Sequence, residues 1–423
     1  MGLSLFRSKN ATMKRILLCL SAVSAALCAP VSAFATEAGR PAPVLLVSID
    51  GFRADYLARG LTPNIARLAL DGVGSAGMRP SFPSSTFPNH YTLVTGRYPD
   101  HHGIVNNTMR DPARPGAVFK LSDRAAVTDP FWWEGATPLW VSAQRQGKVA
   151  ATMFWPGSET PIHGVLPDEW LRYDAAMPYS TRVDTVLSWL SREPGRRPDF
   201  ATLYFEGVDS AGHEHGPDSP QVGKALEDAD AAVGRLLDGL QRAGLKDRVN
   251  LLIVADHGMA AVDPDHAIEL DKRADPNDMD VINSGAVAGV DPKPGKEERV
   301  LQALSAPMNH GRCMAKSALP ASLHYGGHAR VPAIVCIADP GWYFTAKGKF
   351  AGKGTIGMHG YDPAAREMNA LFVAHGPAFR KGVTLPAFGN VDLYPLMARL
   401  VGIHPEPNDG NAATFDAALT PVD

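Results

Sequence analysis

The segment that decides the fold is the apolar run Val44-Leu45-Leu46-Val47-Ser48-Ile49-Asp50, which stops abruptly at its aspartate. The apolar runs of 200–205 and 251–255 repeat the pattern and lead to Asp209 and Asp256. Short apolar runs bounded by polar residues are typical of strands buried in a parallel sheet. Parallel strands end at a common edge, where open α/β sheets bind their ligands. We therefore expect the three aspartates to meet at one edge of a sheet.

Helical periodicity alternates with these runs along most of the chain. Apolar residues recur every three to four positions, as amphipathic helices require, over 61–70, 181–190, 221–240 and 392–401. Further strands are expected at 149–154 and 369–374. The alternation predicts an α/β fold with a mostly parallel central sheet and helices on both faces.

The 423 residues, 45% of them hydrophobic, suffice for one large or two ordinary domains. Between 263 and 354 the composition shifts toward Asp, Pro, Gly and Lys around a strand-like run at 333–337. We interpret 263–354 as an inserted cap or subdomain. Residues 36–262 and 355–423 would then form the core that carries the site.

The first 35 residues have the pattern of a secretory signal peptide. Lys14-Arg15 precede an apolar stretch at 16–26, and Ala33-Phe34-Ala35 offers the small residues of a cleavage site. The alternative is an uncleaved anchor, but the stretch is shorter than the roughly 20 residues that a span needs. We expect a secreted or periplasmic protein cleaved near Ala35, with Met1 or Met13 as its start and no membrane span in the mature chain.

Charge and cysteine content limit the partners of the mature chain. Cleavage would remove four basic residues and change the formal net charge from −3 to −7. An acidic chain without a basic run argues against binding a nucleic-acid polymer. Cys313 and Cys336 would remain, and we expect them to form a disulfide in an oxidising compartment. The alternative, a zinc site, lacks a Cys-x-x-Cys framework.

A glycine pattern at 72–77 matches the dinucleotide-binding fingerprint in spacing but not in structural context. Gly72, Gly74 and Gly77 have the required spacing, yet they follow a helix-like stretch rather than a strand. We interpret the segment as a turn without a role in binding.

Metal-ligand spacing appears at two of the three aspartates. Asp209 and His213 lie one helical turn apart, and Asp256 is followed by His257 and by Gly258, which would permit the chain to turn. One such pair alone is typical of a surface ion pair. A second pair and a third aspartate on the same predicted edge favour a metal site, and His359, in a glycine-flanked loop, is a further candidate.

A hydroxyl-rich segment at 83–90 supplies a candidate nucleophile. It is followed by helix-like sequence, so its hydroxyls could simply cap a helix. A helix start also suits a phosphoryl or sulfuryl group because its N–H groups and dipole favour anions.

The chain resembles the nucleotide pyrophosphatase/phosphodiesterase family of the alkaline phosphatase superfamily, from Leu45 to Val401. The motifs that carry the resemblance are 49–53 (Ile-Asp-Gly-Phe-Arg), 82–90 (Phe-Pro-Ser-Ser-Thr-Phe-Pro-Asn-His), 102–107 (His-Gly-Ile-Val-Asn-Asn), 209–213 (Asp-Ser-Ala-Gly-His), 255–259 (Ala-Asp-His-Gly-Met) and 359–361 (His-Gly-Tyr). Six ordered motifs make the match specific.

The resemblance implies two zinc ions and a hydrolase that acts on nucleotides or other small phosphodiesters. One ion would be held by Asp209, His213 and His359, and the other by Asp50, Asp256, His257 and the hydroxyl of Thr86. Thr86 would attack phosphorus and form a covalent phosphothreonyl intermediate, with Asn107 donating to the oxygen where charge develops. Phe87 and Tyr173 would stack on the base, although as plain sequence either could be a core aromatic. The oligomeric state is not indicated.

Related chemistries are distinguished by the residues after Thr86. Sulfatases need a cysteine or serine followed by an arginine, and phosphomonoesterases pair a serine with an arginine; Thr86 is followed by Phe-Pro-Asn. Phosphonoacetate hydrolases and choline-headgroup phosphodiesterases remain alternatives. A secreted metal-binding protein without activity is the non-enzymatic alternative, and it would require a missing nucleophile or ligand.

Overall fold

The structure, a computed structural model, describes residues 40–346 and 355–421. The predicted signal peptide at 1–35 lies outside the described residues. Within the described ranges, the helices are too short or too polar to cross a membrane.

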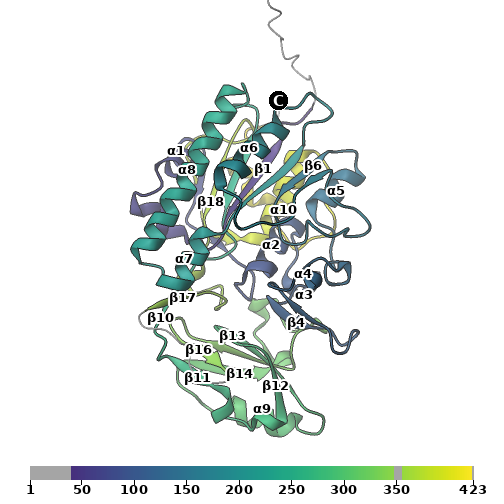
Figure 1. The fold of residues 1–423 in the computed structure, drawn as a ribbon, viewed down its shortest axis with the longest axis vertical. Helices are drawn as coiled ribbons and strands as arrows, with labels where there is room; N and C mark the ends of the chain where they lie inside the picture. Colours follow the sequence, from purple (N-terminus) through teal and green to yellow (C-terminus); the bar gives the residue numbers. More distant parts are fainter. Residues whose placement is uncertain (1–39, 347–354, 422–423) are drawn as a thin grey trace, which may run out of the picture. The chain divides into compact units, whose positions relative to one another are not determined.

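An eight-stranded sheet forms the centre of the fold, in the order β19-β2-β18-β9-β1-β8-β6-β7 (Figure 1). Its strands are β1 Val44–Ile49, β2 Val73–Ser75, β6 Ala150–Met153, β7 Glu169–Trp170, β8 Phe200–Phe205, β9 Asn250–Val254, β18 Phe372–His375 and β19 Val383–Leu385. The three decisive apolar runs are neighbours, because β1 pairs in parallel with both β8 and β9. Strand β18 is antiparallel to β9 and β2, so the sheet is mostly parallel, as expected.

Helices cover both faces of this sheet (Figure 1). One layer contains α1 Pro63–Asp71, α6 Tyr179–Leu190 and α8 Pro220–Arg242, and the other α2 Thr86–Thr95, α5 Leu139–Arg145 and α10 Leu393–Val401. The start of α8 has local causes: Ser219 accepts the N–H of Val222, and Pro220 occupies the first turn. The predicted helices are confirmed with shifts of one or two residues at their ends.

The segment after β9 builds a second, antiparallel sheet in the order β12-β13-β15-β14. Its strands are β12 Met279–Asn283, β13 Val287–Pro292, β14 Gly311–Ala315 and β15 Ile334–Ala338, and α9 Glu297–Ser305 packs on it. A separate cluster of buried residues lies under this sheet and extends from Ala260 to Met368. We propose that it is the inserted subdomain expected at 263–354. The expected disulfide is present, between facing residues Cys313 and Cys336.

Short elements connect these layers. They are α3 Pro99–His102, α4 Arg124–Val127, α7 Gly207–His215, β3 Met78–Arg79, β4 Thr108–Arg110, β5 Val118–Lys120, β10 Ala260–Val262, β11 Ala267–Glu269, β16 Tyr343–Thr345, β17 Ile356–Met358 and β20 Phe388–Gly389.

The glycine pattern at 72–77 has a packing role. It follows α1, and the expectation of a turn is wrong for its middle, because Gly74 lies within β2. A Cβ at Gly72 would overlap the backbone carbonyl oxygen of Ala374, whereas one at Gly74 would meet Ala69 at an ordinary 3.6 Å. Close packing of α1 against β18 therefore requires glycine only at the first position.

Replacing Gly72 by alanine should destabilise the fold, whereas Gly74→Ala, the matched control, should not. We expect Gly72→Ala to cost roughly 1–3 kcal/mol, because the backbone of β18 must move to admit the methyl group. Thermal unfolding of the two variants checks this. Equal melting temperatures would contradict the assignment.

Candidate active site

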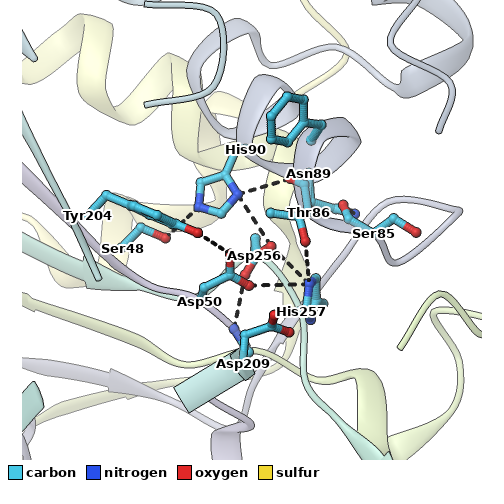
Figure 2. A network of polar contacts seen from close by, with 12 residues as sticks. Ser48, Asp50, Ser85, Thr86, Asn89, His90, Tyr204, Asp209, Asp256 and His257 are labelled. Carbon is cyan, nitrogen blue, oxygen red and sulfur yellow. Dashed lines mark hydrogen bonds and ion pairs between the residues drawn. The ribbon is translucent and has the colours of Figure 1, made fainter. Parts of the chain in front are cut away.

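The three strand-end aspartates converge at one edge of the sheet (Figure 2). Asp50 directly follows β1, and Asp256 follows β9 after one further residue; both are at most 1% exposed. Asp209 lies in the first turn of α7, which begins two residues after β8. The expectation from the three apolar runs is therefore confirmed.

Two groups of potential metal ligands form around these aspartates. Asp50, Asp256 and His257 make up one group, and Asp209, His257 and His359 the other. His257 belongs to both because its Nε2 lies 3.0 Å from Asp256 Oδ2 and 3.4 Å from Asp50 Oδ1, while its ring stacks on His359.

His213 lies beside the second group, on the same helix as Asp209. Its Nε2 is 3.5 Å from Asp209 Oδ1, and His359 Nε2 approaches the same oxygen at 3.7 Å. Besides Thr86, six side chains were predicted from the sequence to be metal ligands. The structure brings all six together.

All three histidines present Nε2 to the aspartates because a backbone carbonyl holds the other nitrogen. His213 Nδ1 pairs with Gly357 O at 2.9 Å, His257 Nδ1 with Gly258 O at 2.8 Å, and His359 Nδ1 with Ser84 O at 2.8 Å. A carbonyl oxygen only accepts hydrogen bonds, so each Nδ1 carries the proton. In a neutral ring, Nε2 then has a free lone pair. Metal-binding histidines are typically oriented in this way.

Three carboxylate oxygens in the site lack the hydrogen bond that burial normally demands. Within the described ranges, Asp50 Oδ1, Asp209 Oδ1 and Asp256 Oδ2 are inaccessible to solvent and accept no hydrogen bond. Each such oxygen would be costly unless a cation compensates it. Hard oxygen and imidazole nitrogen donors suit zinc, so the residues present fit a metal.

The electrostatics of these side chains favour cation binding. Burial raises the pKa of the Asp50 carboxyl well above its usual value, and the charges of Asp256 and Asp209 raise it further. Burial lowers the pKa of His359 well below its usual value, helped by neighbouring His257. The imidazole of His359 is therefore neutral near pH 7, which is the form that binds metals.

Two glycines allow the ligands to approach one another. Gly51 has φ of 68°, and a Cβ there would lie 2.9 Å from Asp209 Cα. The predicted turn would suggest a left-handed conformation at Gly258, but Gly258 does not adopt one. It is required because a Cβ would overlap the carbonyl oxygen of Glu367.

Thr86 is the first residue of α2, and its hydroxyl faces the metal ligands (Figure 2). Its Oγ1 lies 3.3 Å from His257 Nε2. The next backbone N–H, that of Phe87, donates to Asn107 Oδ1 at 2.9 Å. This bond fixes the orientation of the Asn107 amide and leaves its NH₂ group to donate elsewhere. A hydroxyl, an amide donor and the start of a helix therefore lie together beside the two ligand groups.

The two predicted stacking residues differ in burial. Phe87 is partly buried and packs on Phe119 and Trp133, with ring centroids 5.9 Å away in both cases. Tyr173 is 40% exposed and contacts Phe154 by its edge, so the alternative of a core aromatic does not hold for it.

Two side chains that support the site, the partly buried Tyr204 and the buried His90, were missed as functional residues from the sequence. The Tyr204 hydroxyl in β8 donates to Asp50 Oδ2 at 2.6 Å. His90, one turn after Thr86, pairs through Nε2 with Ser48 at 2.8 Å and through Nδ1 with the Thr86 carbonyl at 2.9 Å (Figure 2). In the sequence, the only indication of their role was a polar side chain within an otherwise apolar or helical segment.

Comparison with known proteins places this geometry in a family. Residues 44–362 match the sequence profile described as type I phosphodiesterase / nucleotide pyrophosphatase. The chain belongs to this family. Its members are hydrolases, and their hydrolysis of phosphodiesters is metal-dependent.

Individual relatives cover most of this chain. Mouse ectonucleotide pyrophosphatase/phosphodiesterase family member 1 is 39% identical over 392 residues, 89% of this chain but only 42% of its own length. The chain thus spans less than half of that relative. The bis(5'-adenosyl)-triphosphatase enpp4 of Xenopus laevis is 36% identical over 377 residues, which are 89% of this chain and 81% of the relative.

Solved structures confirm the alkaline phosphatase-like fold. Murine ectonucleotide pyrophosphatase/phosphodiesterase 5 superposes with a TM-score of 0.85 at 37% identity, over 89% of this chain and all of the other. An inactive threonine-to-alanine variant of that murine protein, in complex with AMP, also gives 0.85, at 36% identity over 90% of this chain and all of the other.

The Tyr204→Phe substitution should weaken metal binding. Loss of a hydrogen bond to a metal-binding carboxylate typically costs about 10–100-fold in affinity or activity. Competition with a chelator measures the affinity. The matched control is Tyr56→Phe, because the buried Tyr56 hydroxyl has no hydrogen-bond partner among the described residues. Equal metal affinity in both variants would show that Tyr204 does not support Asp50.

Proposed function

We propose that the protein is a two-zinc phosphodiesterase and nucleotide pyrophosphatase that releases nucleoside monophosphates. The observation that carries the proposal is the position of Thr86, whose hydroxyl lies 3.3 Å from His257, the residue that belongs to both ligand groups. A nucleophile at that point would face a phosphorus atom bound between two cations.

The proposed ligand sets build on the two groups, with His213 added to the second group and His257 assigned to the first. Asp209, His213 and His359 would hold one zinc ion, and Asp50, Asp256 and His257, with Thr86, the other. When bound, the two ions would lower the pKa of the Thr86 hydroxyl, activate water and stabilise charge on the attacking and leaving oxygens.

The chain's own residues would then carry out a double displacement. Thr86 loses its proton to solvent and attacks phosphorus; the Oγ–P bond forms as the bond to the leaving oxygen breaks, and that oxygen keeps the electron pair. The Asn107 NH₂ group and the Thr86 N–H at the start of α2 would stabilise the phosphoryl oxygens. Water then cleaves the phosphothreonyl bond, which releases the monophosphate and returns a proton to Thr86.

The proposed substrates are small nucleotides rather than nucleic-acid polymers. The relatives include a protein named for its action on a bis(5'-adenosyl) triphosphate and one solved with AMP. Phe87 and the exposed Tyr173 would supply stacking surfaces, and stacking tolerates every base. We also propose a secreted or periplasmic location after cleavage near Ala35, and the oligomeric state is left open.

Replacing Thr86 by alanine should abolish turnover without loss of metal. We expect kcat to fall by about a thousandfold or more, because the nucleophile is absent. Thr86→Ser is the matched control and should retain part of the activity. Release of p-nitrophenol from bis-p-nitrophenyl phosphate and the zinc content of each variant are the measurements. Full activity in Thr86→Ala would disprove the covalent mechanism.

Substrate preference tests the family's chemistry independently. The residues after Thr86, Phe-Pro-Asn, provide no arginine to neutralise the additional charge of a monoester. Bis-p-nitrophenyl phosphate and ATP should therefore be cleaved faster than p-nitrophenyl phosphate, and phosphonoacetate should be a poor substrate. Preference for the monoester or for phosphonoacetate would contradict the proposal.

A further inference from the structure

A cavity of about 640 Å³ is lined in part by His213 and His359, two of the predicted metal ligands. Its walls come from distant parts of the chain. The hairpin β4–β5 contributes one side, and the turn between β12 and β13 of the second sheet contributes the other. An ion pair of 3.4 Å between Arg110 and Asp280 links the two walls.

The polar surface of this cavity includes one permanently charged group. Lys120 ends β5, opposite Thr108, and is exposed. Among the described residues, it makes no ion pair or side-chain hydrogen bond, and no Asp or Glu lines the cavity. The remaining polar lining consists of the two histidines and the neutral residues Ser85, Asn106, Asn107, Thr108, Asn283 and Ser284. The cavity therefore offers neutral donors and one unpaired cation.

The position of the cavity relative to the nucleophile assigns it to one part of the substrate. Its lining includes Asn107, His213 and His359 but neither of the stacking residues, Phe87 and Tyr173. Thr86 lies beside His257. In an in-line attack by its hydroxyl, the leaving group departs from the side of phosphorus opposite Thr86. In the proposed mechanism the leaving oxygen would lie on the side of Asp209, His213 and His359, and the last two line this cavity.

We infer that the cavity is the leaving-group subsite and that Lys120 makes it selective for anionic, phosphate-bearing leaving groups. The inference rests on the proposed function and specifies its substrate class as nucleotides whose leaving group is pyrophosphate or a nucleotide. It also gives the second sheet a role, because Ser284, an exposed residue in the β12–β13 turn, lines the subsite.

Two substrates that transfer the same group isolate the leaving-group contact. ATP and the p-nitrophenyl ester of AMP both place AMP on Thr86, but they expel pyrophosphate and p-nitrophenolate, respectively. Lys120→Ala should lower the ratio of kcat/KM for ATP to that for the ester roughly fivefold, as expected for one solvent-exposed charge contact. Lys120→Arg should keep the ratio within about twofold of the wild type, because the charge remains.

A second substitution tests the opposite wall of the cavity. Ser284→Asp places a negative charge beside the leaving group, so it should lower the same ratio while leaving the fold intact at an exposed turn. Lys381→Ala, an exposed lysine away from the cavity, is the control and should not change the ratio.

The outcomes separate this inference from the proposed function. If the wild-type protein hydrolyses neither substrate, the proposed function fails and the subsite with it. If it hydrolyses both and neither Lys120→Ala nor Ser284→Asp changes the ratio, the function stands and the leaving-group subsite is refuted. A lower ratio in both variants, with no change in Lys381→Ala, supports the subsite.

Discussion

Mutual repulsion among buried carboxylates is the constraint on which this structure depends. Asp50 and Asp256 are inaccessible to solvent, and Asp209 presents an inaccessible oxygen to the same space. Ionised carboxylates so placed are expensive unless cations lie between them. Burial first, and then the charges of Asp256 and Asp209, raise the pKa of Asp50 well above its usual value. A fold that retains this arrangement needs a compensating positive charge, and the imidazole of His359, which is neutral near pH 7, offers a cation a further ligand beside the carboxylates.

The sheet and the helices around it hold these side chains close together. Parallel pairing of β1 with β8 and β9 brings the strand ends to one edge, and α2 and α7 begin at that edge. Asp209 in the first turn of α7 benefits from the positive end of the helix dipole. Backbone carbonyls orient each histidine, Tyr204 donates a hydrogen bond to Asp50, and His90 contacts the backbone carbonyl of Thr86. The candidate catalytic groups are thereby held on rigid elements.

Much of the fold and the ligand set follows from local sequence. Apolar runs and helical periodicity located the strands and helices to within a few residues, and the ordered motifs contain the six predicted ligand side chains that the structure brings together. Features that depend on distant contacts were not predictable. In the sequence, Tyr204 is one aromatic residue in a predicted strand. Its hydrogen bond to Asp50 depends on the pairing of β8 with β1, which the sequence does not show. The need for glycine at 258 likewise depends on the carbonyl of Glu367, more than a hundred residues away.

Metal stoichiometry is the decisive measurement. Zinc per chain should be measured by elemental analysis in the wild-type protein and in Asp209→Asn and Asp256→Asn, after equilibration with excess zinc and removal of the unbound ion. We expect two ions in the wild type and about one in each variant, because each substitution removes a carboxylate from one group only. A wild-type protein without bound metal, or variants that both retain two ions, would contradict this expectation.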